Sequence, residues 1–162
     1  MVGDSIPHWA SLEQGRTEMS YFTQRGATWK TIRRVLETEV LLGPPPSKAI
    51  LLQLGGNDVS SCPQKSIFNN IKHEITYLRE AFPEVILMLV DILPRLCWKK
   101  RKRLDRYGAV EAGLNGRHHR LSIDIEFKDV GFFRQNGVHL NQLGLHFYND
   151  AVKEFVNTLS LD

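Results

Sequence analysis

The stretch AILLQLGGND, residues 49–58, contains the pattern on which the fold depends. An almost unbroken apolar run over 49–54 is typical of a strand that is covered on both faces. Two glycines and an Asn-Asp pair follow at once, which is typical of a turn at the end of such a strand. A second run of this kind, VILMLVDIL at 85–93, lies further along the chain. The two runs predict neighbouring buried strands.

Segments of helical period separate the apolar runs. Apolar residues recur every three or four positions, and Pro or Gly stands where two of these patterns stop. We expect helices at 29–40, at 68–82 and from 141 onward. We expect strands at 2–3, weakly at 19–24, at 49–54, at 85–93 and at 125–130. Strands and helices in alternation predict a parallel sheet with helices on both faces, a three-layer α/β/α sandwich.

The composition fits one globular domain. The chain has 162 residues, of which 42% are hydrophobic and 24% charged, so we expect a single domain over 1–162. Cys62 and Cys97 form no CxxC pair, which indicates a reducing compartment rather than a disulfide framework. We expect no metal site. The longest apolar run is too short to span a bilayer, and no signal peptide pattern is visible. We therefore expect an intracellular, cytoplasmic protein, with a nuclear location as the alternative.

Four short motifs follow the expected strands and predict a site at one edge of the sheet. Ser5 lies in GDS, Gly26 in RGATW, Asn57 in GGND and His139 in NGVHLN. Hydrolysis by a serine needs a hydroxyl, a base and donors for the oxyanion. Ser5 supplies the hydroxyl and a backbone N–H, His139 the base, and Gly26 and Asn57 two further donors. The alternatives are a helix cap for Ser5 and an exposed loop position for His139.

The order and spacing of these blocks resemble the SGNH, or GDSL-type, hydrolases over nearly the whole chain. The resemblance implies a flavodoxin-like sheet, Ser5 as nucleophile and His139 as base. It also implies an oxyanion hole from Ser5, Gly26 and Asn57, no metal or organic cofactor, and small acyl esters of the acetyl type as substrates.

A narrower resemblance is carried by RGATW, LQLGGNDV, ILPRLCW and NGVHLNQLG. These segments are similar to the esterase domain in the first open-reading-frame protein of some vertebrate LINE-type retrotransposons and in copies derived from it. That resemblance implies association with RNA or membranes.

One residue departs from the family pattern. SGNH enzymes usually carry an aspartate three residues before the histidine, and Asn136 stands there. The acid orients the imidazole, and replacing it by asparagine in a serine protease costs about 10⁴ in turnover. Asn136 could accept from the ring through its carbonyl oxygen or present its NH₂ instead. We expect a weakened Ser–His site. Less favoured substitute acids are Asp124, Asp129 and Asp150.

A second departure concerns the first strand. The family's strand precedes GDS by several residues, whereas only Met1 and Val2 precede it here. We therefore expect a truncated first strand.

The segment 95–106 holds seven basic residues and one acidic residue. It is either a solvated loop or a contact for phosphates of RNA or an anionic membrane. The candidate polyanion-binding residues are Lys99, Lys100, Arg101, Lys102 and Arg103. This segment and Asn136 favour the alternative function, a weakened or inactive domain that binds RNA, lipid or protein. The sequence leaves the oligomeric state open.

Overall fold

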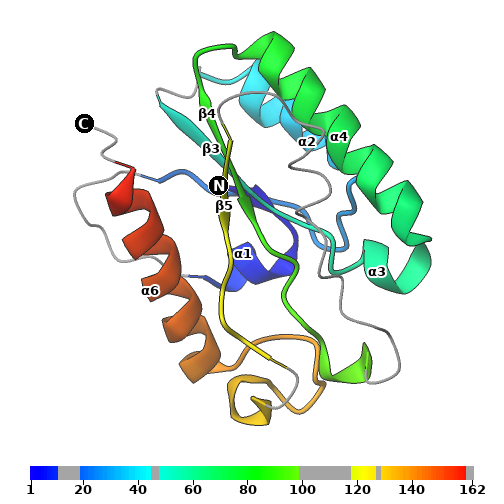
Figure 1. The fold of residues 1–162 in the computed structure, drawn as a ribbon, viewed down its shortest axis with the longest axis vertical. Helices are drawn as coiled ribbons and strands as arrows, with labels where there is room; N and C mark the ends of the chain where they lie inside the picture. The colour runs from blue at the N-terminus through cyan, green and yellow to red at the C-terminus, as the bar shows by residue number, and fades with distance from the viewer. Residues whose placement is uncertain (11–18, 45–47, 99–117, 127–128, 160–162) are drawn as a thin grey trace.

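The computed structural model describes residues 1–10, 19–44, 48–98, 118–126 and 129–159. Five parallel strands form one sheet in the order β2-β1-β3-β4-β5 (Figure 1). The strands are β1 (Val2–Gly3), β2 (Phe22–Thr23), β3 (Ala49–Gln53), β4 (Ile86–Val90) and β5 (His118–Leu121). This order is the flavodoxin-like one, and its direction reverses between β1 and β3, which is where sites form in such sheets.

The central strands are buried on both faces because their apolar side chains alternate between two cores. Ile50 and Leu52 of β3 pack into one core, and Leu51 packs into the other. The same alternation holds in β4 for Leu87 and Met88. A two-residue period with apolar residues at every position places the sheet as the middle layer of three.

One face of the sheet is covered by α4 (Gln64–Ala81) and by α2 (Arg33–Val35), which continues as a π-helical stretch, η1 (Leu36–Leu41) (Figure 1). The core-facing residues of α4 are spaced by three or four positions and are at most 1% exposed. They are Ile67, Ile71, Ile75 and Leu78. This spacing is one stripe of an α-helix. The short α3 (Asp58–Ser61) precedes α4.

The opposite face is covered by α1 (Ser5–Trp9) and α6 (Gln142–Thr158). Tyr148, Val152 and Val156 of α6 are buried against the sheet at four-residue spacing. Two 3₁₀ turns, η2 (Leu96–Trp98) and η3 (Val130–Phe132), lie in the connections. The three-layer sandwich predicted from the sequence is therefore confirmed. No helix in the described part of the chain combines the length and apolarity that crossing a bilayer requires.

The position of the last strand was predicted wrongly. The strand is β5, His118–Leu121, which pairs in parallel with β4, whereas 125–130 was expected. Asp91 just beyond β4 holds Arg120 through two bonds of 2.6 and 2.7 Å. Beyond β5, the N–H of Ile125 bonds to the carbonyl of Ile123 at 2.8 Å, and this tight turn takes the backbone out of the sheet.

Candidate active site

Ser5 lies where β1 ends and α1 begins, at the reversal of the sheet order. The carboxylate of Asp4 caps the helix, because its Oδ1 accepts from the N–H of Ile6 at 3.1 Å. Asp4 is fully buried, and its own N–H bonds to the carbonyl of Gln53 in β3 at 3.3 Å. Ser5 is thus attached to the rigid centre of the sheet.

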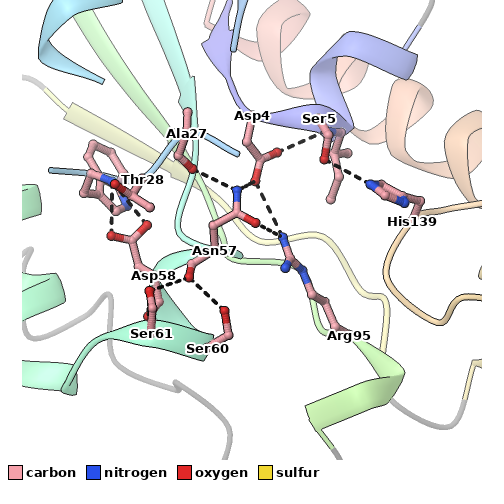
Figure 2. A network of polar contacts seen from close by, with 12 residues as sticks. Asp4, Ser5, Ala27, Thr28, Asn57, Asp58, Ser60, Ser61, Arg95 and His139 are labelled. Atoms are coloured by element: carbon pink, nitrogen blue, oxygen red, sulfur yellow. Dashed lines mark hydrogen bonds and ion pairs between the residues drawn. The ribbon is translucent and has the colours of Figure 1, made fainter. Parts of the chain in front are cut away.

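His139 reaches Ser5 from the opposite end of the chain. Its Nε2 lies 3.2 Å from the Ser5 hydroxyl oxygen, although 134 positions separate the two residues (Figure 2). A backbone bond of 2.8 Å from the N–H of Arg134 to the carbonyl of His139 closes the loop that carries the histidine. Asn141 then caps α6 by accepting from the N–H of Gly144 at 3.0 Å. The structure therefore brings Ser5 and His139 together.

Asn136 contacts the other ring nitrogen of His139. Its Nδ2 lies 3.0 Å from Nδ1 of the imidazole. Its Oδ1 accepts from the N–H groups of Val138 and His139 at 3.0 and 3.1 Å. A reversed amide would turn its NH₂ toward these two backbone donors, so the turn itself fixes the amide orientation.

The amide orientation sets the tautomer of the imidazole. An amide nitrogen only donates, so Nδ1 of His139 accepts and the ring proton resides on Nε2. Nε2 then donates to the Ser5 hydroxyl rather than accepting from it. A general base needs a free lone pair at Nε2. Of the two options open for Asn136, the structure has the less favourable one for catalysis.

Asn57 occupies the centre of a polar network next to Ser5 (Figure 2). Its NH₂ donates to the carbonyl of Ala27 at 2.9 Å and, more weakly, to Asp4 at 3.5 Å. Its carbonyl oxygen accepts from the guanidinium of Arg95 at 3.0 Å. Because Arg95 fixes the oxygen, the NH₂ can point only away from Arg95. Of the two hydrogens on the Asn57 NH₂ group, the one facing Asp4 at 3.5 Å makes the weaker hydrogen bond. That hydrogen can more easily bond to an oxyanion instead.

Arg95 fits because Gly56 has no side chain. A Cβ at Gly56 would lie 2.5 Å from a guanidinium nitrogen of Arg95. Arg95 is only 8% exposed and lies 3.8 Å from the Asp4 carboxylate. The second glycine of GGND thus makes room for a buried cation.

Two backbone N–H groups are further candidate donors. Ser5 begins α1, where helix N–H groups have no partner within the helix. Gly26 has a φ of +75°, which glycine adopts without strain. Within the part of the chain that the structure describes, neither N–H is bonded to an acceptor. With Asn57, they can supply the donors that an oxyanion needs.

Asp58 holds the loops of Gly26 and Asn57 together. Both of its carboxylate oxygens accept from the N–H of Trp29, at 3.1 and 3.2 Å. Trp29 is 1% exposed and anchors the segment after β2 in the core. The distance between the two loops is therefore fixed by a buried bond.

The environment lowers the pKa of His139 below its usual value. Burial is the main cause, and the positive charges of Arg95, Arg134 and Arg25 add to it. Burial raises the pKa of Asp4, and the bond from Ile6 and the charge of Arg95 offset part of this rise. Because the pKa of His139 lies below its usual value, its imidazole is neutral at neutral pH, as a base must be.

The acids considered as substitutes for Asn136 have other partners or lie away from His139 in the hydrogen-bond network. Asp129 accepts from the N–H of Glu126 at 2.7 Å, and Asp150 pairs with His146 at 3.4 Å. Among the described residues, no carboxylate is bonded to His139. The candidate polyanion segment from Lys99 to Arg103 lies outside the described residues.

Sequence reasoning missed Arg95 and Asp58 as parts of the site. Arg95 was counted only within the basic segment, although it follows the strand β4 closely, where the rule for parallel sheets would have selected it. Asp58 belongs to GGND, but its bond to Trp29 joins residues 29 positions apart and leaves no local pattern.

A parallel α/β sheet with a Ser–His pair at its reversal point defines the class of fold. No protein-family model matches the sequence, and no curated protein matches it. Solved structures do. A Streptococcus pneumonia protein provisionally named a platelet activating factor is 18% identical with a TM-score of 0.74, over 95% of this chain and 81% of that chain. A family 3 carbohydrate esterase from Talaromyces cellulolyticus is 20% identical with a TM-score of 0.67, over 86% and 70%.

A GDSL-like lipase from Bacteroides thetaiotaomicron is 16% identical with a TM-score of 0.67, over 98% of this chain and 86% of that chain. The chain therefore has the SGNH hydrolase fold. The esterase domain of the ZfL2-1 ORF1 protein from a zebrafish retrotransposon covers 97% of this chain and 96% of its own at 19% identity, with a TM-score of 0.43. That score supports no conclusion, and the retrotransposon resemblance stays a prediction.

Proposed function

We propose that this protein is a serine esterase that hydrolyses small acyl esters slowly. The observation that carries the proposal is the 3.2 Å contact between the Ser5 hydroxyl and His139, beside two backbone N–H groups for which the described residues offer no acceptor. The fold supports it, because structural neighbours include proteins named as esterases and a lipase.

Each part of the site has a role in the proposed reaction. The Ser5 oxygen attacks the ester carbonyl carbon, and Nε2 of His139 takes the hydroxyl proton. The N–H groups of Ser5 and Gly26 and the amide of Asn57 stabilise the oxyanion. His139 returns the proton to the leaving alcohol, and water then releases the acid from Ser5.

The slow rate follows from Asn136. For Nε2 to accept a proton, Nδ1 of His139 must carry one, which then faces the NH₂ of Asn136. Either the Nδ1–H of His139 then faces the NH₂ of Asn136 with no acceptor between them, or the amide of Asn136 turns and loses its bonds to the N–H groups of Val138 and His139. An unmet donor costs about 1–3 kcal/mol, which is roughly one to two powers of ten in rate. The missing carboxylate charge lowers the rate further.

The test is reaction of Ser5 with a fluorophosphonate probe, together with turnover of p-nitrophenyl acetate. Labelling and turnover should disappear in Ser5→Ala and remain in Ser66→Ala, which removes an exposed serine of α4. An unreactive but folded parent protein would contradict the proposal. The predicted alternative, a binding domain without activity, would then take its place.

A further inference from the structure

Three arginines lie on segments that carry or adjoin the residues of the Ser5–His139 site. Arg25 follows β2 and directly precedes Gly26, Arg95 follows β4, and Arg134 lies on the loop of His139. Backbone bonds place the segments of Arg25 and Arg134 near the site, and the N–H of Arg134 bonds to the carbonyl of His139 at 2.8 Å. The N–H of Gln24 bonds to the carbonyl of Gly3 at 3.1 Å, so the segment after β2 runs beside GDS.

The three arginines differ in depth. Arg95 is buried, donates to Asn57 and lies 3.8 Å from Asp4, which offsets part of its charge. Arg25 and Arg134 are exposed. Among the described residues, no carboxylate lies within ion-pair distance of Arg25. Arg134 donates from Nε to the carbonyl of Leu140 at 3.1 Å, which ties the start of its guanidinium to the loop.

Their charges reach the catalytic histidine. All three contribute to the lowered pKa of His139, after burial. The position next to the ring at which an SGNH enzyme usually has a carboxylate is taken by the neutral Asn136. The described charges that act on the imidazole are therefore positive, and they would attract an anionic group of a substrate before any oxyanion has formed.

We propose that the ester hydrolysed at this site carries a negative charge on its alcohol part, which Arg134 and Arg25 bind. This inference rests on the proposed function. His139 must return a proton to the leaving alcohol, so the alcohol oxygen lies beside Nε2 and the rest of the alcohol extends past the loop of Arg134. A guanidinium matches the paired oxygens of a carboxylate, phosphate or sulfate.

The experiment compares 4-acetoxybenzoate with its neutral methyl ester, each rate being divided by the uncatalysed rate. The kcat/KM should favour the anionic ester, and the preference should fall as salt is added. Arg134→Gln and Arg25→Gln should each reduce the preference about two- to fivefold. Arg134→Lys should keep part of it. Arg34→Gln, which removes an exposed charge on α2, should keep all of it.

A binding measurement separates this inference from the proposed function. Both esters are titrated calorimetrically into Ser5→Ala, which turns over neither. Serine-dependent hydrolysis without a preference overturns the inference and leaves the esterase standing. If the parent protein hydrolyses neither ester, the esterase proposal fails. Tighter binding of the anionic ester, weakened by Arg134→Gln, then still supports the anion site, and equal binding of the two esters overturns it.

Discussion

The amide nitrogen of Asn136 lies 3.0 Å from Nδ1 of His139 and holds the imidazole in the tautomer opposite to that of a general base. The loop enforces this, because two backbone N–H groups bind the amide oxygen. A carboxylate in the same turn would accept the two N–H groups with one oxygen and leave the other for the ring. The backbone N–H groups of this turn therefore suit an aspartate at position 136.

Asn136→Asp should therefore raise turnover. The carboxylate accepts from Nδ1–H, frees the lone pair of Nε2 and stabilises the imidazolium, which we expect to increase kcat by between about tenfold and 10⁴-fold. The measurement is kcat for p-nitrophenyl acetate. Asn69→Asp, on the exposed side of α4, adds the same charge away from the site and should change nothing. An unchanged kcat in folded Asn136→Asp would exclude the tautomer as the limiting feature.

The pH dependence should follow the lowered pKa of His139. Protonated imidazole accepts nothing from Ser5, so kcat/KM falls as the pH drops through the pKa of the free enzyme. With the pKa below the usual value of 6.5, the acid limb should lie below that pH. Asn136→Asp places a negative charge beside the ring, raises the pKa of His139 and should move the limb to higher pH. A parent limb at or above pH 6.5 would contradict this.

Gly56→Ala should impair the site more than the fold. The new Cβ would lie 2.5 Å from the guanidinium nitrogen of Arg95 that bonds to Asn57, so this group must shift and we expect the bond to be lost. We expect turnover to fall about tenfold or more, because the amide then loses the orientation that an oxyanion donor needs. Gly131→Ala is the matched control, since nothing lies within 4 Å of its Cβ position. The kcat and the urea unfolding of both variants are measured. Equal kcat values for Gly56→Ala and Gly131→Ala would refute the role of Arg95 in orienting the Asn57 amide.

Ile71→Ala tests the core between α4 and the sheet. Ile71 is fully buried, so the substitution leaves a cavity and should lower the free energy of unfolding by about 2–5 kcal/mol. Leu42 is 83% exposed, and Leu42→Ala should change that free energy by no more than about 0.5 kcal/mol. Urea denaturation measures both. Similar losses in the two variants would mean that this face of the sheet is not packed as described.

The sequence predicted the layers because its periods are strong. Buried strands such as 49–54 carry unbroken apolar runs, and α4 and α6 show clear helical spacing. The last strand was missed because HHRL is polar, and its place at β5 depends on pairing with β4 and on the bond between Asp91 and Arg120. No local pattern records such contacts.

The sequence predicted the main residues of the candidate site, but it did not predict how their hydrogen-bonding groups are oriented. Ser5 and His139 stand in motifs, and the rule that sites form at strand ends brought them together. The choice between the two ends of the Asn136 amide depended on the N–H groups of a turn. The role of Arg95 depended on the space left by Gly56. Both are properties of packed neighbours.

The separation of 134 positions between Ser5 and His139 also affects how activity is acquired during folding. Contacts between distant parts of a chain form late, because the loop between them must first be ordered. The pair can meet only when β1 is paired in the sheet and α6 has docked against it. Labelling of Ser5 during refolding would therefore follow completion of the native sheet, whereas helix signals would rise earlier.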